Sequence, residues 1–238
     1  MTSTTHRTAL VARLVSLLVG VVIVSAGCGD HAGSGSPSDP SSPAPSTATS
    51  PTSATTNGIP DDFPMALGLR SDGDSTVTTP RHDARGVTLQ RTCWGGAWPG
   101  SAVDRLVVQQ TGPELGLTRE LALYPNARAA AQVGRQVRRK AGVCGQIPAT
   151  RRTTAIDVTA YGDDVTGGAP VTAGFAETLP DGQPGGSVFV FTRVGRAILA
   201  VEDSGEWTRD TAGRGVRHLV RSDRALVARL CVFTGTGC

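Results

Sequence analysis

Apolar and polar residues alternate in short stretches between residues 86 and 205, and Gly or Pro bounds most of these stretches. Because successive side chains of a strand point to opposite faces of a sheet, this alternation predicts β-strands. Val194-Gly195-Arg196 tightly connects the last two strands and predicts a hairpin. The predicted strands span residues 86–94, 104–112, 118–125, 154–162, 169–180, 186–195 and 196–205.

Two segments change to a period of three to four residues, which predicts helices with one apolar side. The first spans residues 126–144, and Asn126 is suited to its N-cap. The second spans residues 210–231 and is weakened by Gly213 and Gly215. Strands that are close in sequence pair as antiparallel meanders, and one-sided helices need a sheet to cover. The pattern therefore predicts an α+β domain, with a twisted, mainly antiparallel sheet of about six to seven strands and two helices packed on it.

One long apolar run, residues 14–26, lies between Arg13 and Cys28. The order of positive, apolar and small residues is that of an export signal, and the run is short for a membrane span. A short transmembrane anchor or a buried helix is the alternative. The stretch VSAGC, which ends at Cys28, resembles a bacterial lipobox. This resemblance implies that the signal is cleaved before Cys28 and that Cys28 carries the lipid.

The composition divides the chain into three parts. Residues 1–27 are predicted to be a lipoprotein signal peptide. Residues 28–58 follow the lipidated cysteine with a Ser/Thr/Pro-rich tether, which has too few large apolar side chains to form a core. Residues 59–238 are predicted to fold as an extracytoplasmic domain. We therefore expect a protein anchored in the cell membrane through Cys28, with its folded domain outside the cytoplasm.

Charge gives no indication of a nucleic-acid partner. The chain has 23 basic and 20 acidic residues, and Arg7 and Arg13 belong to the predicted leader, so the remainder is nearly neutral. Nucleic-acid binding needs a clustered basic surface. The local cluster on the first predicted helix is interpreted as a solvated face; its members are Arg135, Arg138, Arg139 and Lys140.

Four cysteines remain when Cys28 is set aside, an even number that predicts disulfides in an exported domain. No two of them have a C-x-x-C spacing, and no histidine lies at a ligand-like interval, so a metal site is not expected. Because Cys144 and Cys231 each end a predicted helix, we expect two disulfides, Cys144–Cys231 and Cys93–Cys238. The alternative Cys231–Cys238 bridge closes a short loop and would stabilise the fold less.

Residues Asp72, Asp74 and Thr76 match the D-x-D-x-T nucleophile loop of haloacid dehalogenase phosphatases. That loop follows a buried strand of a parallel sheet, whereas a β-rich meander follows here, so a polar turn is expected instead. A calcium loop starting at Asp72 would have Val77 where glycine is required, and Asp83 where glutamate is required. We therefore expect no catalytic residues and no cofactor.

Two of the three tryptophans, Trp94 and Trp98, lie in the glycine-rich stretch CWGGAWPG. Exposed indoles there would stack on a sugar, a lipid or an apolar side chain of a partner. The alternative is that both tryptophans fill an edge of the core near the Cys93 bridge. Substitution of both tryptophans by Ala distinguishes the two roles. If the indoles bind a ligand, the variant loses binding and keeps its stability; if they fill the core, it loses stability.

Taken together, these features resemble actinobacterial extracytoplasmic sensor-domain lipoproteins, which are similar to the external domain of mycobacterial receptor Ser/Thr kinases. The stretches that carry the resemblance are IPDDFPMALGL, RTCWGGAWPG, RELALYPNARAAAQVGRQVRRKAGVC and VFVFTRVGRAILAV. The resemblance implies a disulfide-linked α+β domain that binds an unidentified small-molecule, glycan or protein ligand without catalysis. A lipid or glycolipid carrier and a cell-envelope hydrolase are the alternatives.

Overall fold

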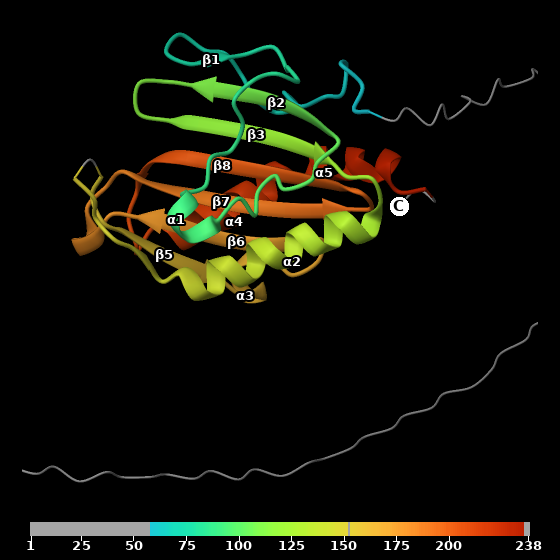
Figure 1. The fold of residues 1–238 in the computed structure, drawn as a ribbon. Helices are drawn as coiled ribbons and strands as arrows, with labels where there is room; N and C mark the ends of the chain where they lie inside the picture. The colour runs from blue at the N-terminus through green and yellow to red at the C-terminus, as the bar shows by residue number, and fades with distance from the viewer. Residues whose placement is uncertain (1–57, 152, 236–238) are drawn as a thin grey trace, which may run out of the picture. The chain divides into compact units, whose positions relative to one another are not determined.

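The computed structural model describes residues 58–151 and 153–235. Within them, eight strands form one antiparallel sheet in the order β1-β2-β3-β8-β7-β6-β5-β4 (Figure 1). Each of the six long strands corresponds to a predicted strand. Two-residue strands at the two edges bring the total to eight, above the predicted six to seven. The strands are β1 (Thr76–Val77), β2 (Asp104–Thr111), β3 (Gly116–Leu123), β4 (Gln146–Ile147), β5 (Ile156–Tyr161), β6 (Val171–Thr178), β7 (Gly186–Val194) and β8 (Ala197–Trp207).

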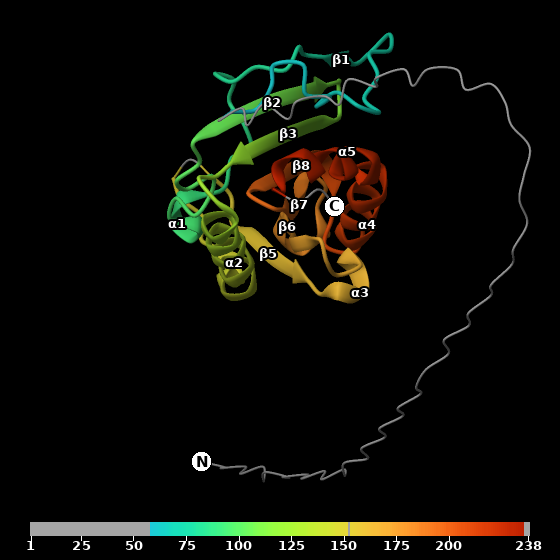
Figure 2. The same cartoon turned by 90° about the vertical axis from the view of Figure 1, so that its right-hand side faces the viewer.

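Helices cover both faces of the sheet, which confirms the predicted α+β class (Figure 2). On one face, here called the α2 face, lie α1 (Arg91–Trp94) and α2 (Ala127–Cys144). On the other, here called the α4 face, lie α4 (Ala212–Ser222) and α5 (Arg224–Arg229). The short elements are α3 (Asp163–Thr166), η1 (Pro180–Gly182) and η2 (Leu230–Phe233).

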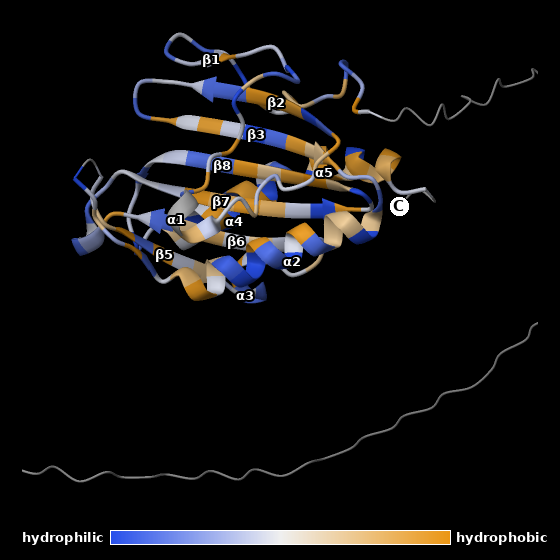
Figure 3. Cartoon of the chain, viewed as in Figure 1, coloured by the Kyte–Doolittle hydropathy of each residue, from blue (hydrophilic) through white to orange (hydrophobic). Residues whose placement is uncertain are grey.

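The β7–β8 hairpin forms the centre of the sheet and divides its apolar side chains between two cores. Phe189 and Phe191 pack on the α2 face, whereas Val188 and Val190 pack on the α4 face. This division follows from the period of two along a strand. Figure 3 shows the resulting concentration of apolar residues in the central strands. The predicted turn is present at Gly195, whose φ of 56° lies in the region that favours glycine.

Helix α2 begins and ends within one residue of its predicted bounds. The side chain of Asn126 accepts a hydrogen bond from the backbone N–H of Ala129 at 2.9 Å, as expected of an N-cap. One side of the helix packs on the sheet through small and β-branched residues, and the opposite side faces solvent. The buried residues are Ala130, Val133, Gly134, Val137 and Ala141.

Residues 86–94 are not a strand, contrary to the prediction. This segment lies across the α2 face, where Val87 and Trp94 are buried, and its last four residues form α1. Its Val, Thr and Leu content favours a strand, but the segment buries Val87 and Trp94 on the face of the sheet instead of pairing at an edge. Tertiary packing thus overrides local propensity here.

The predicted helix over residues 210–231 is divided into two. Asp223 caps the end of α4 through its backbone N–H and has φ −92° and ψ 1°, outside the helical region, and α5 begins at the next residue. The division lets Leu219 and Leu226 both reach the core of the α4 face. Among the described residues, no helix is long and apolar enough to cross a membrane.

Candidate functional site

The structure describes most of the residues that the sequence singled out. Cys28, the predicted lipidation site, and Cys238 lie outside the described residues. Four others belong to one cluster on the α2 face: Cys93, Trp94, Trp98 and Cys144.

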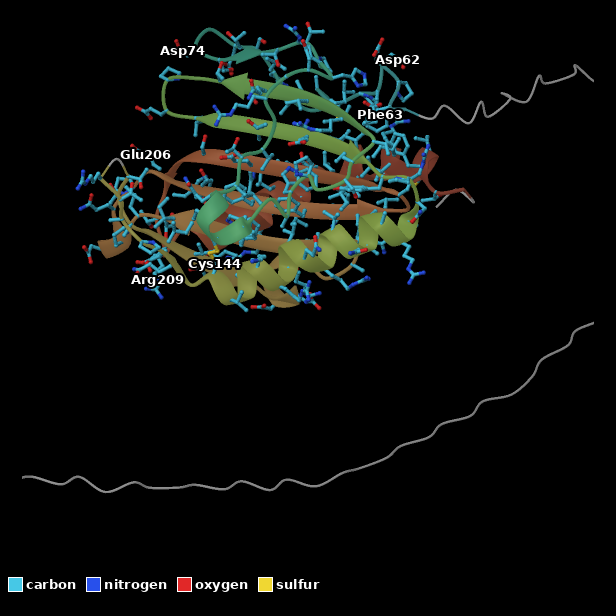
Figure 4. The ribbon with its side chains drawn as sticks, in the orientation of Figure 1. Asp62, Phe63, Asp74, Cys144, Glu206 and Arg209 are labelled. Carbon is cyan, nitrogen blue, oxygen red and sulfur yellow. A yellow bond between two sulfur atoms is a disulfide. The ribbon has the colours of Figure 1, made fainter. Side chains whose placement is uncertain are left out.

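Cys93 is bonded to Cys144, with 5.9 Å between the two Cα atoms (Figure 4). The predicted pairs Cys144–Cys231 and Cys93–Cys238 are therefore wrong. The prediction relied on each cysteine ending a helix that lies on the sheet and did not consider on which face each helix lies. In the structure Cys144 ends α2 on one face, whereas Cys231 lies in η2, whose residue Phe233 belongs to the core of the other face.

One disulfide joins described residues, where two were predicted. Cys231 is not a free thiol. Since Cys93 and Cys144 are bonded to each other, we now predict Cys238 as the partner of Cys231.

Both tryptophans are buried, with exposed fractions of 1% for Trp94 and 8% for Trp98. The Trp94 indole N–H donates to Glu177 Oε1 at 2.8 Å, and the Trp98 indole N–H donates to Glu120 Oε2 at 3.1 Å. The Trp94 ring also packs against Phe175, with 4.5 Å between the ring centroids. The alternative of exposed, ligand-stacking indoles is therefore wrong, and both side chains fill the core.

Residues 85–99, here called the Trp segment, are held on the sheet by buried carboxylates. Glu120 is fully buried and accepts hydrogen bonds from the backbone N–H of Val87 at 2.9 Å and from Arg105 Nε at 2.5 Å. Burial raises the pKa of Glu120, and the Arg105 charge and the Trp98 hydrogen bond oppose that rise. A side chain at Gly86 would meet the Glu120 carboxylate, so this backbone approach requires glycine.

A second carboxylate, Glu177 of β6, lies beneath Trp94 and beside Glu202 of β8. Burial, together with the charge of Glu202, raises the pKa of Glu177 to about 7 in spite of the Trp94 hydrogen bond. Burial also raises the pKa of Glu202, although hydrogen bonds from the Thr88 backbone and the Ser187 side chain oppose the rise. Burial is thus the main cause of both rises.

Glu177 has the raised pKa that is typical of the general acid of a hydrolase. It does not have the access that a substrate needs, because it is 8% exposed and the indole of Trp94 covers it. In this conformation Glu177 and Glu202 hold the Trp segment in place, through Trp94 and the Thr88 backbone.

The stability of the domain is expected to fall by about 2–3 kcal/mol between pH 5 and pH 8 through Glu177 alone. Its pKa in the folded protein, about 7, lies above its ordinary value of 4.5. A raised carboxyl pKa stabilises the fold below pH 4.5, and that contribution is lost as the pH rises through 7. Urea unfolding of the wild type and of Glu177→Gln at both pH values measures the effect.

The Gln variant keeps an acceptor for Trp94 and has no proton to lose, so its stability is expected to change less over this range. The pKa of His82 is also raised, because hydrogen bonds and charges from Asp104 and Asp61 outweigh its burial. The stability that comes from His82 is also lost as the pH rises, in both proteins. The effect of Glu177 is therefore the difference between the pH profiles of the wild type and the variant. Identical pH profiles for the two proteins would contradict the role of Glu177.

The Asp72–Asp74 motif forms a polar turn at the sheet edge, and Figure 4 labels Asp74 there. The hydroxyl of Ser75 donates to Asp72 Oδ1 at 2.7 Å across the turn. The turn leads into an edge strand of an antiparallel sheet, which is not the setting of a phosphatase nucleophile loop. Among the described residues, no group of three or more His, Cys, Asp or Glu side chains is placed to hold a metal ion.

A pocket of about 150 Å³ lies on the α4 face, between the loop at residues 166–171 and the junction of α4 with α5. Polar and charged residues in its lining are Thr166, Thr192, Asp223 and Arg224. Its aliphatic walls come from β7, β8 and the two helices; they are Val190, Leu199, Val201, Leu219, Val220 and Val227.

Asp223 connects this pocket with a buried ion pair. Arg119 Nη2 donates to Asp223 Oδ1, and Arg119 Nη1 donates to the carbonyl oxygens of Met65 and Leu67 at 3.0 and 2.8 Å. Asp223 Oδ2 is buried without a hydrogen-bond partner among the described residues. Asp223 is thus both a lining residue of the pocket and the carboxylate of the buried ion pair.

Sequence reasoning missed the charged residues of both sites. Glu120, Glu177 and Arg119 each lie within a predicted strand, at a position that alternation assigns to a covered face. A charged residue among inward-facing apolar neighbours was the available signal, because such a residue is almost never buried unless it is paired.

A search of solved structures found the extracellular domain of PknH from Mycobacterium tuberculosis. The two chains are 11% identical, with a TM-score of 0.46 over 67% of this chain and 90% of that one. No family model matches the chain, and a search of curated proteins found no match.

Proposed function

We propose that this chain is a lipoprotein held on the outer side of the cell membrane through Cys28, with a non-catalytic domain that binds a ligand or a protein partner. A role as a sensor or an accessory protein follows from this arrangement. The VSAGC stretch and the Ser/Thr/Pro-rich tether support the anchor. The Cys93–Cys144 disulfide supports an oxidising compartment, because such bridges persist outside the cytosol.

The pocket on the α4 face is the observation that carries the binding proposal. It combines aliphatic walls with a few polar groups, the usual composition of a ligand site. Its volume of about 150 Å³ equals that of an engineered apolar cavity that binds benzene. The occupant is therefore a small molecule, or one small group of a larger partner.

The same volume argues against the carrier alternative, because a whole acyl chain needs a larger cavity than one sized for benzene. The hydrolase alternative has less support than binding. Its strongest candidate residue, Glu177, is covered by Trp94, and the Asp72–Asp74 motif is an exposed turn.

Filling the pocket is expected to release the bound molecule. Val220 is half-buried in the pocket lining, so Val220→Trp places an indole where the ligand would lie. We expect native mass spectrometry of protein extracted from membranes to detect a small molecule with the wild type and to detect little of it with Val220→Trp.

Val143→Trp is the matched control, because it makes the same change at an exposed position of α2. It is expected to retain the molecule. Equal retention by Val220→Trp, or no bound molecule in the wild type, would count against this pocket as the ligand site.

The anchor is tested separately. A Cys28→Ser chain is expected to lose the acyl label in cells fed a labelled fatty acid, because the lipid is attached at that sulfur. Acylation that persists in the variant would overturn the proposed anchor.

A further inference from the structure

We infer that the exposed side of α2 is a docking surface for the anionic headgroups of a lipid bilayer. The inference rests on the proposed anchor, which is what places the domain beside a membrane. The 18-residue helix carries no acidic side chain, and Figure 3 shows hydrophilic turns in its C-terminal half. Five exposed side chains make up this surface, here called the basic surface: Arg128, Arg135, Arg138, Arg139 and Lys140.

The arrangement of these charges disfavours the helix itself. Arg135 lies three and four residues before Arg138 and Arg139, a spacing at which like charges repel on a helix surface. The first turn has no acidic residue and the last turn has no basic one, so the charges gain nothing from the helix dipole. A helix that only faces water usually mixes both signs at these spacings.

Within the described part of the chain, ion pairing offsets little of this repulsion. The basic surface makes one ion pair, between Arg138 Nη2 and Asp163 Oδ1 at 3.7 Å, and both side chains are mostly exposed. Such a pair is weak in water. The remaining positive charge is therefore available to an anionic partner.

Helix α4 gives a useful contrast, since it also lacks acidic residues and carries three arginines, Arg214, Arg217 and Arg221. Arg221 lies in the last turn of α4, where the helix dipole favours a positive charge. Helix α2 carries five positive side chains and none of them lies in its last turn, which is why we assign the docking role to α2.

The shape of the basic surface suits a bilayer. Helix α2 lies on the outside of the sheet, as Figure 2 shows, and its 18 residues extend over about 27 Å. A shallow hollow of about 580 Å³ lies between Gln132, Gln136 and three of the arginines, where a headgroup fits. Val143, 78% exposed, follows the basic residues and can enter the headgroup boundary.

Association with an anionic membrane is expected to depend on charge and salt. Each Lys or Arg near an anionic leaflet contributes about fivefold in affinity, so removal of three is expected to weaken binding on the order of 100-fold. Added salt screens exposed charges and weakens binding in the same way.

The test uses the chain from residue 28 with Cys28→Ser, so that no lipid anchor contributes. Its flotation is measured with phosphatidylcholine vesicles and with vesicles that also contain phosphatidylglycerol. We expect salt-sensitive binding to the second kind alone. The variant Arg135→Gln, Arg139→Gln, Lys140→Gln is expected to lose about 100-fold in affinity. Arg138 is left intact because it pairs with Asp163.

A charge-matched control, Arg214→Gln, Arg217→Gln, Arg221→Gln, removes three arginines from α4 and is expected to bind almost as the wild type does. Equal losses in the two variants, or equal binding to both kinds of vesicle, would overturn the inference. So would binding to soluble polygalacturonate without binding to vesicles, which would assign the surface to an anionic polymer. The protein used here lacks Cys28, so the vesicle results and the acylation test of the proposed anchor can fail separately.

Discussion

A chain with Asp223 replaced by alanine is expected to lose about 3–5 kcal/mol of unfolding free energy. The substitution leaves the guanidinium of Arg119, whose side chain is 2% exposed, as a buried charge without its carboxylate partner. Desolvation of that charge is then no longer compensated, which is the costly way to break a buried ion pair. Urea unfolding followed by circular dichroism measures the loss.

The control removes both charges together, as Arg119→Met with Asp223→Leu. Replacement of a whole buried pair by apolar side chains of similar size is often neutral, so the cost of the unpaired charge is expected to be recovered. Arg119 also donates to the carbonyl oxygens of Met65 and Leu67, and losing those bonds is expected to leave a cost of about 2 kcal/mol. A double variant no more stable than Asp223→Ala would contradict the unpaired Arg119 charge as the cause of the loss.

This pair illustrates why charged residues of the core were harder to predict than the strands that carry them. The alternating pattern around Arg119 and Glu120 predicts β3 and places the two side chains on opposite faces. It does not identify their partners. Asp223 lies 104 residues further along the chain, and Trp98 and Arg105 reach Glu120 only through the packing of other segments.

Elements with a long, regular pattern were predicted well. Helix α2 has a complete apolar stripe and a good N-cap, so its bounds differ from the predicted ones by one residue. The segment at residues 86–94 has strand-forming residues, but it gains more by burying Trp94 against Phe175 and Glu177 than by pairing at an edge. The contacts that decide its conformation are distant in sequence, and local propensity contains no information about them.

The pocket on the α4 face was not predictable for a related reason. It lies where the predicted second helix is divided at Asp223, beside residues 166–171, which also line it. Gly213 and Gly215 indicated that this helix was weak, but the division comes eight residues after the second glycine. Gly215 instead gives room to the ring of Trp207, which approaches it closely.

The disulfide prediction used the position of Cys144 and Cys231 at helix ends, and the sequence did not tell on which face of the sheet each helix lies. The sheet in fact separates Cys144 from Cys231, so each cysteine must find a partner on its own face. For Cys144 that partner is Cys93 at the end of the Trp segment. The bridge thus fixes α1 to the end of α2 and holds Trp94 over Glu177.

Replacement of Cys93 and Cys144 by serine is expected to lower the free energy of unfolding by about 4 kcal/mol, because the bridge closes a loop with a sequence separation of 51 residues. The matched control, Cys231→Ser with Cys238→Ser, removes the predicted short bridge and is expected to cost about 2.5 kcal/mol. Urea unfolding measures both losses, and peptide mapping under non-reducing conditions establishes the pairs. A Cys144–Cys231 peptide, or an equal loss in the two variants, would contradict a long bridge on the α2 face. Without the Cys93–Cys144 disulfide, the Trp segment is no longer covalently bonded to α2. The Cys93→Ser, Cys144→Ser variant, unlike the control, is therefore also expected to increase the exposure of Trp94 to a fluorescence quencher.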